Sequence, residues 1–162
     1  GLAKYRPMKT HENILLFAKK PGGTYNPIME KGEPFKRQSK NPEGYVSKRN
    51  DHGYGLKPVK GFENKGTRYP KSILNISRDF SAQQQVHPTQ KPVPVLEWLI
   101  TTFSNEGDTV LDNCMGSGST GVAAVKLNRK FIGIETDEKY MSIAQDRISV
   151  LVDKPLDMCY AI

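Results

Sequence analysis

The chain has 162 residues, of which 36% are hydrophobic, and this length suits one domain with a modest core. No stretch approaches the roughly 18 apolar residues of a membrane span, and residues 1–10 include no apolar run of the signal-peptide kind. The two cysteines, Cys114 and Cys159, belong to no Cys and His cluster, so neither a disulfide framework nor a metal site is indicated. A reducing, cytoplasmic setting is therefore expected.

The net charge of +7 is spread unevenly along the chain. Residues 1–86 hold 17 Lys and Arg against 7 Asp and Glu, whereas residues 87–162 hold 7 against 10. The first part would attract a polyanion such as nucleic acid, and the second would not. A solvated basic surface explains the same numbers, and charge alone does not separate these two interpretations.

The first predicted element is a buried strand at residues 12–19, because an apolar run at 14–18 lies between polar flanks. Residues 24–86 then show no sustained helical or strand period, which is unusual in a compact domain. Basic residues alternate there with the aromatics Tyr25, Phe35, Tyr45, Tyr54, Phe62 and Tyr69. This interleaving suits contact with phosphates and bases, or else a loop-rich lid whose aromatics form their own small core.

From residue 87 onward the pattern becomes regular. Apolar residues at 95, 96, 99, 100 and 103 predict an amphipathic helix that tolerates Pro94 in its first turn. Strands are predicted at 109–111 and 130–135, and helices at 120–127 and 137–150. The fold class is therefore α/β, with part of a Rossmann-like sheet beside a loop-rich basic region.

A glycine-rich loop between the first of these strands and the next helix carries the pattern G-x-G-x-x-G at Gly116, Gly118 and Gly121. Glu135 follows Gly116 by 19 residues, at the end of the next strand, where a carboxylate can accept both hydroxyls of a ribose. The sequence thus predicts a cofactor that contains a ribose. The alternative, a turn for close helix–strand packing, would require the glycines but not Glu135.

Two features argue against a dinucleotide as that cofactor. Asp112 ends the strand four residues before Gly116, whereas a pyrophosphate requires the first glycine almost directly after the strand. A longer loop with an acidic start suits a ligand that bears an ammonium group and no phosphate, such as S-adenosylmethionine. Thr89 and Lys91 lie just upstream, where a lysine could meet the carboxylate of that ligand.

The segment His87-Pro88-Thr89-Gln90-Lys91-Pro92, followed by the loop from Asp112 and then by residues 131–135, resembles the β class of DNA amino-methyltransferases. The match is specific over residues 87–148 and looser earlier, for example at 10–17. Members of this class methylate adenine N6 or cytosine N4 at specific DNA sites in bacterial and phage restriction–modification systems.

The resemblance implies roles for matching positions. The implied cofactor-binding residues are Thr89, Lys91, Asp112, Gly116, Gly118, Ser119, Thr120 and Glu135. Glu135 would hold the ribose, Thr89 and Lys91 would face the methionine end, and His87 would have a structural role. The implied partner is double-stranded DNA.

The resemblance also divides the chain into three parts. Residues 1–23 would end a catalytic subdomain, residues 24–86 would be a target-recognition region, and residues 87–162 would be the S-adenosylmethionine-binding subdomain.

The catalytic motif of the class is Asp, Asn or Ser, then Pro-Pro and an aromatic residue, and this chain has no Pro-Pro dipeptide. The nearest segment, Asn26-Pro27-Ile28, lacks the second proline and the aromatic residue. In the class this motif holds the target amine and stacks on the extruded base. No catalytic residue is therefore assigned, and we expect a C-terminal fragment, a split subunit or an inactive truncation.

Three functions remain open on the sequence alone. The first is part of an S-adenosylmethionine-dependent DNA methyltransferase, completed by a catalytic half or paired with a second copy. The second is a truncated homologue that binds DNA or protein without turnover. The third, a dinucleotide oxidoreductase, is disfavoured by Asp112 and by the position of Gly116.

Overall fold

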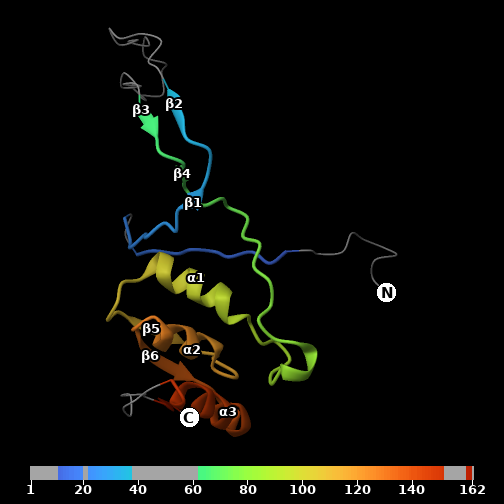
Figure 1. The fold of residues 1–162 in the computed structure, drawn as a ribbon. Helices are drawn as coiled ribbons and strands as arrows, with labels where there is room; N and C mark the ends of the chain where they lie inside the picture. The colour runs from blue at the N-terminus through green and yellow to red at the C-terminus, as the bar shows by residue number, and fades with distance from the viewer. Residues whose placement is uncertain (1–10, 20–21, 38–61, 152–159, 162) are drawn as a thin grey trace, which may run out of the picture.

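The computed structural model describes residues 11–19, 22–37, 62–151 and 160–161. Figure 1 shows a compact α/β unit formed by the C-terminal part of the chain and an extended part that rises away from it. The compact unit contains, in chain order, α1 (Val93–Phe103), β5 (Thr109–Asp112), α2 (Ser119–Lys126), β6 (Lys130–Ile134), α3 (Glu138–Ser149) and β7 (Tyr160–Ala161). The predicted order of helices and strands after residue 87 is confirmed, with bounds shifted by one or two residues.

The sheet of the compact unit is parallel, in the order β5-β6-β7. Thr109 lies opposite Lys130, and Asp112 lies opposite Gly133. Because β5 and β6 are parallel and in this register, their carboxyl ends meet at one edge, where Asp112 and the residue after β6, Glu135, come together. β7 was not predicted from the sequence.

Local signals explain where the helices begin. α1 tolerates Pro94 because the N–H groups of a first turn have no partner within the helix. α3 begins after Asp137, whose Oδ1 accepts hydrogen bonds from the N–H groups of Lys139 and Tyr140 at 2.9 and 3.2 Å.

Within the described ranges no helix is both long and apolar enough to cross a membrane.

The buried apolar residues of the described chain all lie in this unit. They are Val93, Ile100, Met115, Val122, Ala123, Ala124, Phe131, Ala144 and Ile148. A side chain at Gly121 would collide with Ile148 and Phe131, so this glycine lets α2 approach its neighbours. The third glycine of the pattern therefore has a packing role, and the core lies directly behind the glycine-rich loop.

The prediction of a buried strand at residues 12–19 is wrong. This segment forms no strand with any described residue, and the side chains of residues 14–17 are between 53% and 87% exposed. An apolar run supplies strand propensity, but a strand requires a partner backbone and a covered face. Neither is present among the described residues.

The expectation of no regular structure in residues 24–86 is wrong for four short strands. These are β1 (Glu30–Lys31), β2 (Phe35–Arg37), β3 (Phe62–Asn64) and β4 (Thr67–Arg68). β1 pairs with β4 and β2 with β3, both antiparallel, as two separate two-stranded sheets; in Figure 1 the β2–β3 pair, here called the ribbon, lies above the β1–β4 pair. Strands of two or three residues are too short to produce a visible alternation. The predictions for Tyr45 and Tyr54 lie outside the described residues.

Asn26 joins the extended part to the end of α1. Its backbone N–H donates to the carbonyl of Thr102 at 2.7 Å. Its side-chain Nδ2 donates to the carbonyls of Thr101 and Ser104 and to Oδ1 of Asn105, at 3.3, 3.0 and 3.2 Å. One asparagine thus satisfies acceptors that the helix end leaves free.

Candidate functional site

The candidate site lies at the carboxyl ends of β5 and β6. In open parallel sheets, ligands bind outside this edge, where the loops that follow the strands converge. The loop between β5 and α2 holds Asp112, Gly116 and Gly118, and Glu135 directly follows β6. The structure therefore brings the acidic and glycine positions singled out in the sequence to the same edge.

Asp112 fixes the start of the loop and the first turn of α2. Its Oδ1 accepts the N–H of Cys114 at 3.0 Å, and its Oδ2 accepts the hydroxyl of Thr120 at 2.6 Å. Asp112 and Thr120, both predicted site residues, are thus in direct contact. Because a carboxylate has about four acceptor positions, Asp112 retains capacity for a ligand.

Glu135 accepts three backbone hydrogen bonds. Its Oε1 binds the N–H groups of Asp137 and Thr136 at 3.0 and 2.9 Å, and its Oε2 binds that of Gly116 at 2.8 Å. The bond from Asp137 is the main cause that lowers the pKa of Glu135; partial burial opposes it, and the bonds from Gly116 and Thr136 reinforce it. The side chain is therefore a carboxylate at neutral pH, aimed at the glycine-rich loop.

Both Gly116 and Gly118 have backbone conformations that disfavour other residues, with φ of 52° and 76°. A Cβ at Gly116 would lie 3.3 Å from Nε2 of His87, and one at Gly118 would lie 2.8 Å from Cβ of Ala144. Both glycines and the neighbouring Ser119 are buried. The loop is consequently packed tightly against the compact unit, and without side chains at these two positions a ligand can approach its backbone closely.

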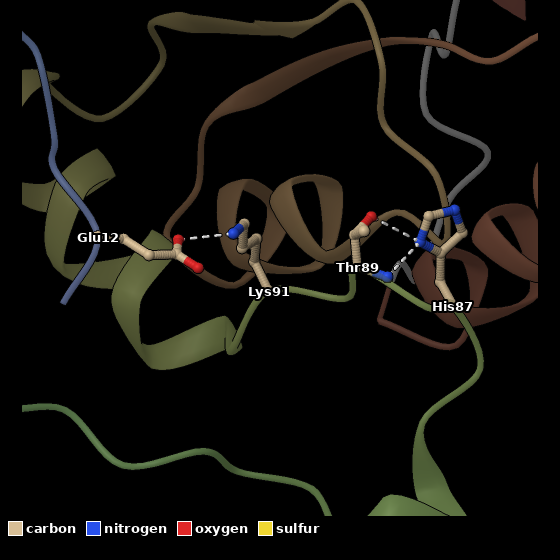
Figure 2. A network of polar contacts seen from close by, with 4 residues as sticks. All are labelled: Glu12, His87, Thr89 and Lys91. Atoms are coloured by element: carbon tan, nitrogen blue, oxygen red, sulfur yellow. Dashed lines mark hydrogen bonds and ion pairs between the residues drawn. The ribbon is translucent and has the colours of Figure 1, made fainter. Parts of the chain in front are cut away.

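His87 and Thr89 are joined beside this loop, as Figure 2 shows. Nδ1 of His87 accepts the N–H of Thr89 at 3.2 Å and lies 3.1 Å from the Thr89 hydroxyl. The ring of His87 packs edge-on against Tyr140 of α3, with centroids 4.2 Å apart. These contacts place Thr89 near Gly116 through His87.

Lys91 contacts Glu12 instead of the loop. Its Nζ lies 2.7 Å from Oε2 of Glu12, and both side chains are more than half exposed (Figure 2). Glu12 is in the extended segment that the sequence predicted as a strand. In this structure the ion pair joins that segment to the residues just before α1, which sequence reasoning did not anticipate.

Arg147 of α3 is a further residue at the site that the sequence analysis missed. Its Nη1 donates to the carbonyl of Ser117 at 2.5 Å and lies within hydrogen-bond distance of the hydroxyls of Ser117 and Ser119. The only sequence signal is its position next to Ile148, on the buried side of α3. An arginine at that position is more often a solvated charge.

The charges at this edge indicate the kind of ligand that fits it. Neither Asp112 nor Glu135 forms an ion pair within the part of the chain that the structure describes. Two carboxylates that no described cation pairs with disfavour a pyrophosphate and favour a ligand with hydroxyl donors or positive charge. Among the described residues, no group of His, Cys, Asp and Glu could hold a metal ion.

Parallel strands, a glycine-rich turn between strand and helix, and an acid at the end of the next strand define a Rossmann-like fold that binds a nucleoside cofactor. The sequence of the chain identifies the family more narrowly. A family profile described as DNA methylase matches residues 2–146, and the chain belongs to this family.

Curated relatives match a shorter stretch. The type II methyltransferase M2.LlaDCHI of Lactococcus lactis subsp. cremoris is 49% identical over 63 residues, which are 39% of this chain and 23% of the relative. M2.DpnII of Streptococcus pneumoniae is 50% identical over 62 residues, 38% of this chain and 23% of the relative. The matched stretch thus spans about a quarter of the length of these relatives.

Among solved structures, that of the M1.HpyAVI-SAM complex is 28% identical, with a TM-score of 0.43. The match covers 74% of this chain and 63% of that chain.

Proposed function

We propose that this chain forms the cofactor-binding and DNA-contacting part of a DNA amino-methyltransferase, which transfers a methyl group from S-adenosylmethionine to adenine N6 or cytosine N4. One observation carries the proposal: in a member of the DNA methylase family, the carboxylate of Glu135 accepts the Gly116 N–H at the edge where β5 and β6 end. This arrangement provides an acceptor for ribose hydroxyls beside a close backbone approach.

The donor and acceptor groups of the site fit S-adenosylmethionine, which would supply the methyl group when bound. Glu135 would bind the ribose, and Asp112 would bind the ammonium group through its remaining acceptor positions. Gly116 and Gly118 would lie against the adenosine portion together with Ser119 and Thr120.

The methionine carboxylate would be held by Thr89 and Lys91. For Lys91 this requires that its ammonium group leave Glu12 or bind both carboxylates at once, because the two side chains are 2.7 Å apart in this structure. The exposure of the pair makes such an exchange inexpensive, since surface ion pairs contribute at most about 1 kcal/mol.

Methyl transfer would need groups that this chain does not supply. The chain has no Pro-Pro dipeptide, and the curated matches cover about a quarter of the relatives. We therefore propose that the residues that polarise the target amine lie in a catalytic half outside these 162 residues, or that a second copy completes the enzyme. The role of this chain would be to bind and orient the cofactor and the DNA.

We further propose the division into residues 1–23, 24–86 and 87–162, with DNA contacted by the middle part. The ribbon supports this, because Phe35 and Phe62 pack edge-to-face at 5.4 Å and remain nearly half exposed. Arg37 lies directly opposite Phe62 in the ribbon. A two-stranded ribbon fits the major groove of DNA, and an arginine beside exposed aromatics suits phosphate and base contacts.

Calorimetric titration of S-adenosylmethionine into the chain tests the proposal, with Glu135→Gln as the variant and Glu138→Gln as the control. Loss of a hydrogen bond to a charged group is expected to weaken binding about 10- to 100-fold in Glu135→Gln. Glu138, on the first turn of α3 and exposed, should be neutral. A folded wild-type chain that shows no saturable binding would overturn the proposal. Binding of cofactor and DNA by this chain, with no turnover even when a relative's catalytic half is added, would favour the inactive homologue.

A further inference from the structure

Arg147 reaches from α3 to the back of the glycine-rich loop. Its Nη1 donates to the Ser117 carbonyl at 2.5 Å, and it lies 3.0 Å from the Ser117 hydroxyl and 3.3 Å from that of Ser119. Ser117 and Ser119 are only 3% and 6% exposed. The guanidinium group therefore binds the residues on both sides of Gly118, in a part of the loop that water hardly reaches.

The position of this cation is unfavourable by simple electrostatics. α2 begins at Ser119, and the N-terminus of a helix repels a positive charge. Burial lowers the pKa of Arg147, and the charge of Asp79 only partly opposes this. Hydrogen bonds to a buried carbonyl and two hydroxyls must offset these penalties, so the contacts of Arg147 with the loop determine its position.

Asp112 holds Cys114 and Thr120, and Glu135 holds Gly116, but no other described side chain bonds Ser117 or Ser119 on either side of Gly118. Gly118 is the N-cap of α2, with φ of 76° and no side-chain cap. Its N–H donates to the carbonyl of Met115 at 2.9 Å, and its own carbonyl accepts from Val122 at 3.0 Å. Because glycine is the residue most free to change conformation, this turn is the place where the loop would open.

We propose that Arg147 is a positioning residue for the cofactor loop: it holds Ser117 and Ser119 so that the backbone of Gly116 and Gly118 keeps the geometry that receives the cofactor. The inference rests on the proposed function for the identity of the ligand, but not for the effect on the loop. Arg147 acts through the loop and does not itself contact the cofactor.

Arg129 provides a matched control within the same unit. It is also buried, at 8% exposure, and it also binds a serine and backbone carbonyls. Its Nη1 donates to the carbonyl of Leu127 at 2.5 Å, its Nη2 to the carbonyl of Ser104 at 2.8 Å, and its Nε to the Ser104 hydroxyl at 3.1 Å. These contacts lie at the opposite end of α2, so Arg129 shares the chemistry of Arg147 but not its loop.

The test compares Arg147→Met and Arg147→Lys with Arg129→Met and Arg129→Lys in the full chain. Three quantities are measured: the melting temperature, the Kd for S-adenosylmethionine, and hydrogen exchange of the amides of Gly118 and Val122 without cofactor. Arg147→Met is expected to weaken binding about 10-fold and to speed exchange at both amides about 10-fold. Arg147→Lys should restore part of both effects, because an ammonium group can still reach one acceptor.

The Arg129 variants are expected to lower the melting temperature while the Kd and the exchange of these two amides stay at wild-type values. If the Arg147 variants do not fold, Ser117→Ala replaces them in the test, because it removes one acceptor of Arg147 and little volume. It should weaken cofactor binding and speed amide exchange, as expected for Arg147→Met. Unchanged exchange at Gly118 and Val122 in folded Arg147 variants, or an equal effect from Arg129→Met, would overturn the inference. A wild-type chain that binds no cofactor would overturn the proposed function alone, since the exchange experiment still decides the role of Arg147.

Discussion

The compact unit and the extended part of this chain are stabilised in different ways. Between residues 93 and 148 the apolar side chains bury one another, and the parallel sheet and three helices share one core. Among the described residues 11–19, 22–37 and 62–86 no side chain is buried, and the apolar residues Phe17 and Ile73 are more than 80% exposed. The extended part therefore depends on a few polar anchors and on its ribbon, whereas the compact unit can hold a site rigidly.

The largest expected effect is a loss of stability of the compact unit when Gly118 of the glycine-rich loop is substituted. In Gly118→Ala the new Cβ would lie 2.8 Å from Cβ of Ala144 and 3.0 Å from its Cα, at a φ of 76°. Backbone strain and overpacking together should reduce the free energy of unfolding by about 3 kcal/mol. Urea denaturation monitored by circular dichroism measures this value.

Gly107→Ala is the control for the backbone contribution. Gly107 also has a positive φ, of 82°, but a Cβ there would meet nothing within 4 Å. Its variant should therefore lose only about 1–2 kcal/mol. Equal losses in the two variants would mean that the clash of the new Cβ with Ala144 adds nothing to the backbone strain.

The next largest effect concerns the contact between the extended part and the compact unit. Asn26→Ala removes the three side-chain hydrogen bonds to the end of α1 and leaves the compact unit intact. We expect faster proteolysis within residues 22–37, with a change of less than about 1 kcal/mol in the unfolding of the core. Limited proteolysis followed by mass spectrometry gives the cleavage sites. A large drop in core stability would show that the extended part is integral to the compact unit.

A smaller effect concerns pH. The pKa of Glu135 in the folded chain lies below its ordinary value of 4.5, so the unfolded chain binds a proton more readily. The resulting stability is complete above that ordinary value and is lost as pH falls through the lower pKa of the folded state. Unfolding measured between pH 7 and about 3 should therefore show a shallower decline in Glu135→Gln than in the wild type. Parallel curves would mean that the backbone bonds to Glu135 do not favour its charged form.

The smallest expected effect concerns the exposed ion pair between Lys91 and Glu12. Glu12→Gln should change the free energy of unfolding by less than about 1 kcal/mol, and added salt should remove most of the difference. If Lys91 receives the cofactor carboxylate, the same variant should bind S-adenosylmethionine slightly more tightly, because a competing carboxylate is gone. Weaker binding in Glu12→Gln would argue that Glu12 orients Lys91 for the ligand.

The same contrast explains what could be predicted from the sequence. The helices and strands after residue 87 have apolar patterns long enough to read, and Gly116, Gly118 and Glu135 have a spacing that places them together once the strands are parallel. In the extended part the apolar run at residues 14–17 led to a wrong strand prediction. The run has strand propensity, but no described strand pairs with it.

Long-range side-chain contacts were beyond sequence reasoning for a different reason. Arg147 meets Ser117 across 30 positions, Asn26 meets Ser104 across 78, and Lys91 meets Glu12 across 79. Polar side chains of this kind show no periodicity, and their partners become defined only when the packing of α1 and α3 is known. The sequence pattern therefore could not predict these contacts.

The hydrogen bond from the Gly116 amide to Glu135 makes that amide a spectroscopic reporter. Its proton senses the charge of Glu135 directly, so its chemical shift should respond both to protonation of the carboxylate and to any hydroxyl that takes over one of its acceptor positions. A single resolved resonance in an isotopically labelled chain would then record occupancy of the site without an activity assay. Binding could be followed in this way without a measurement of turnover.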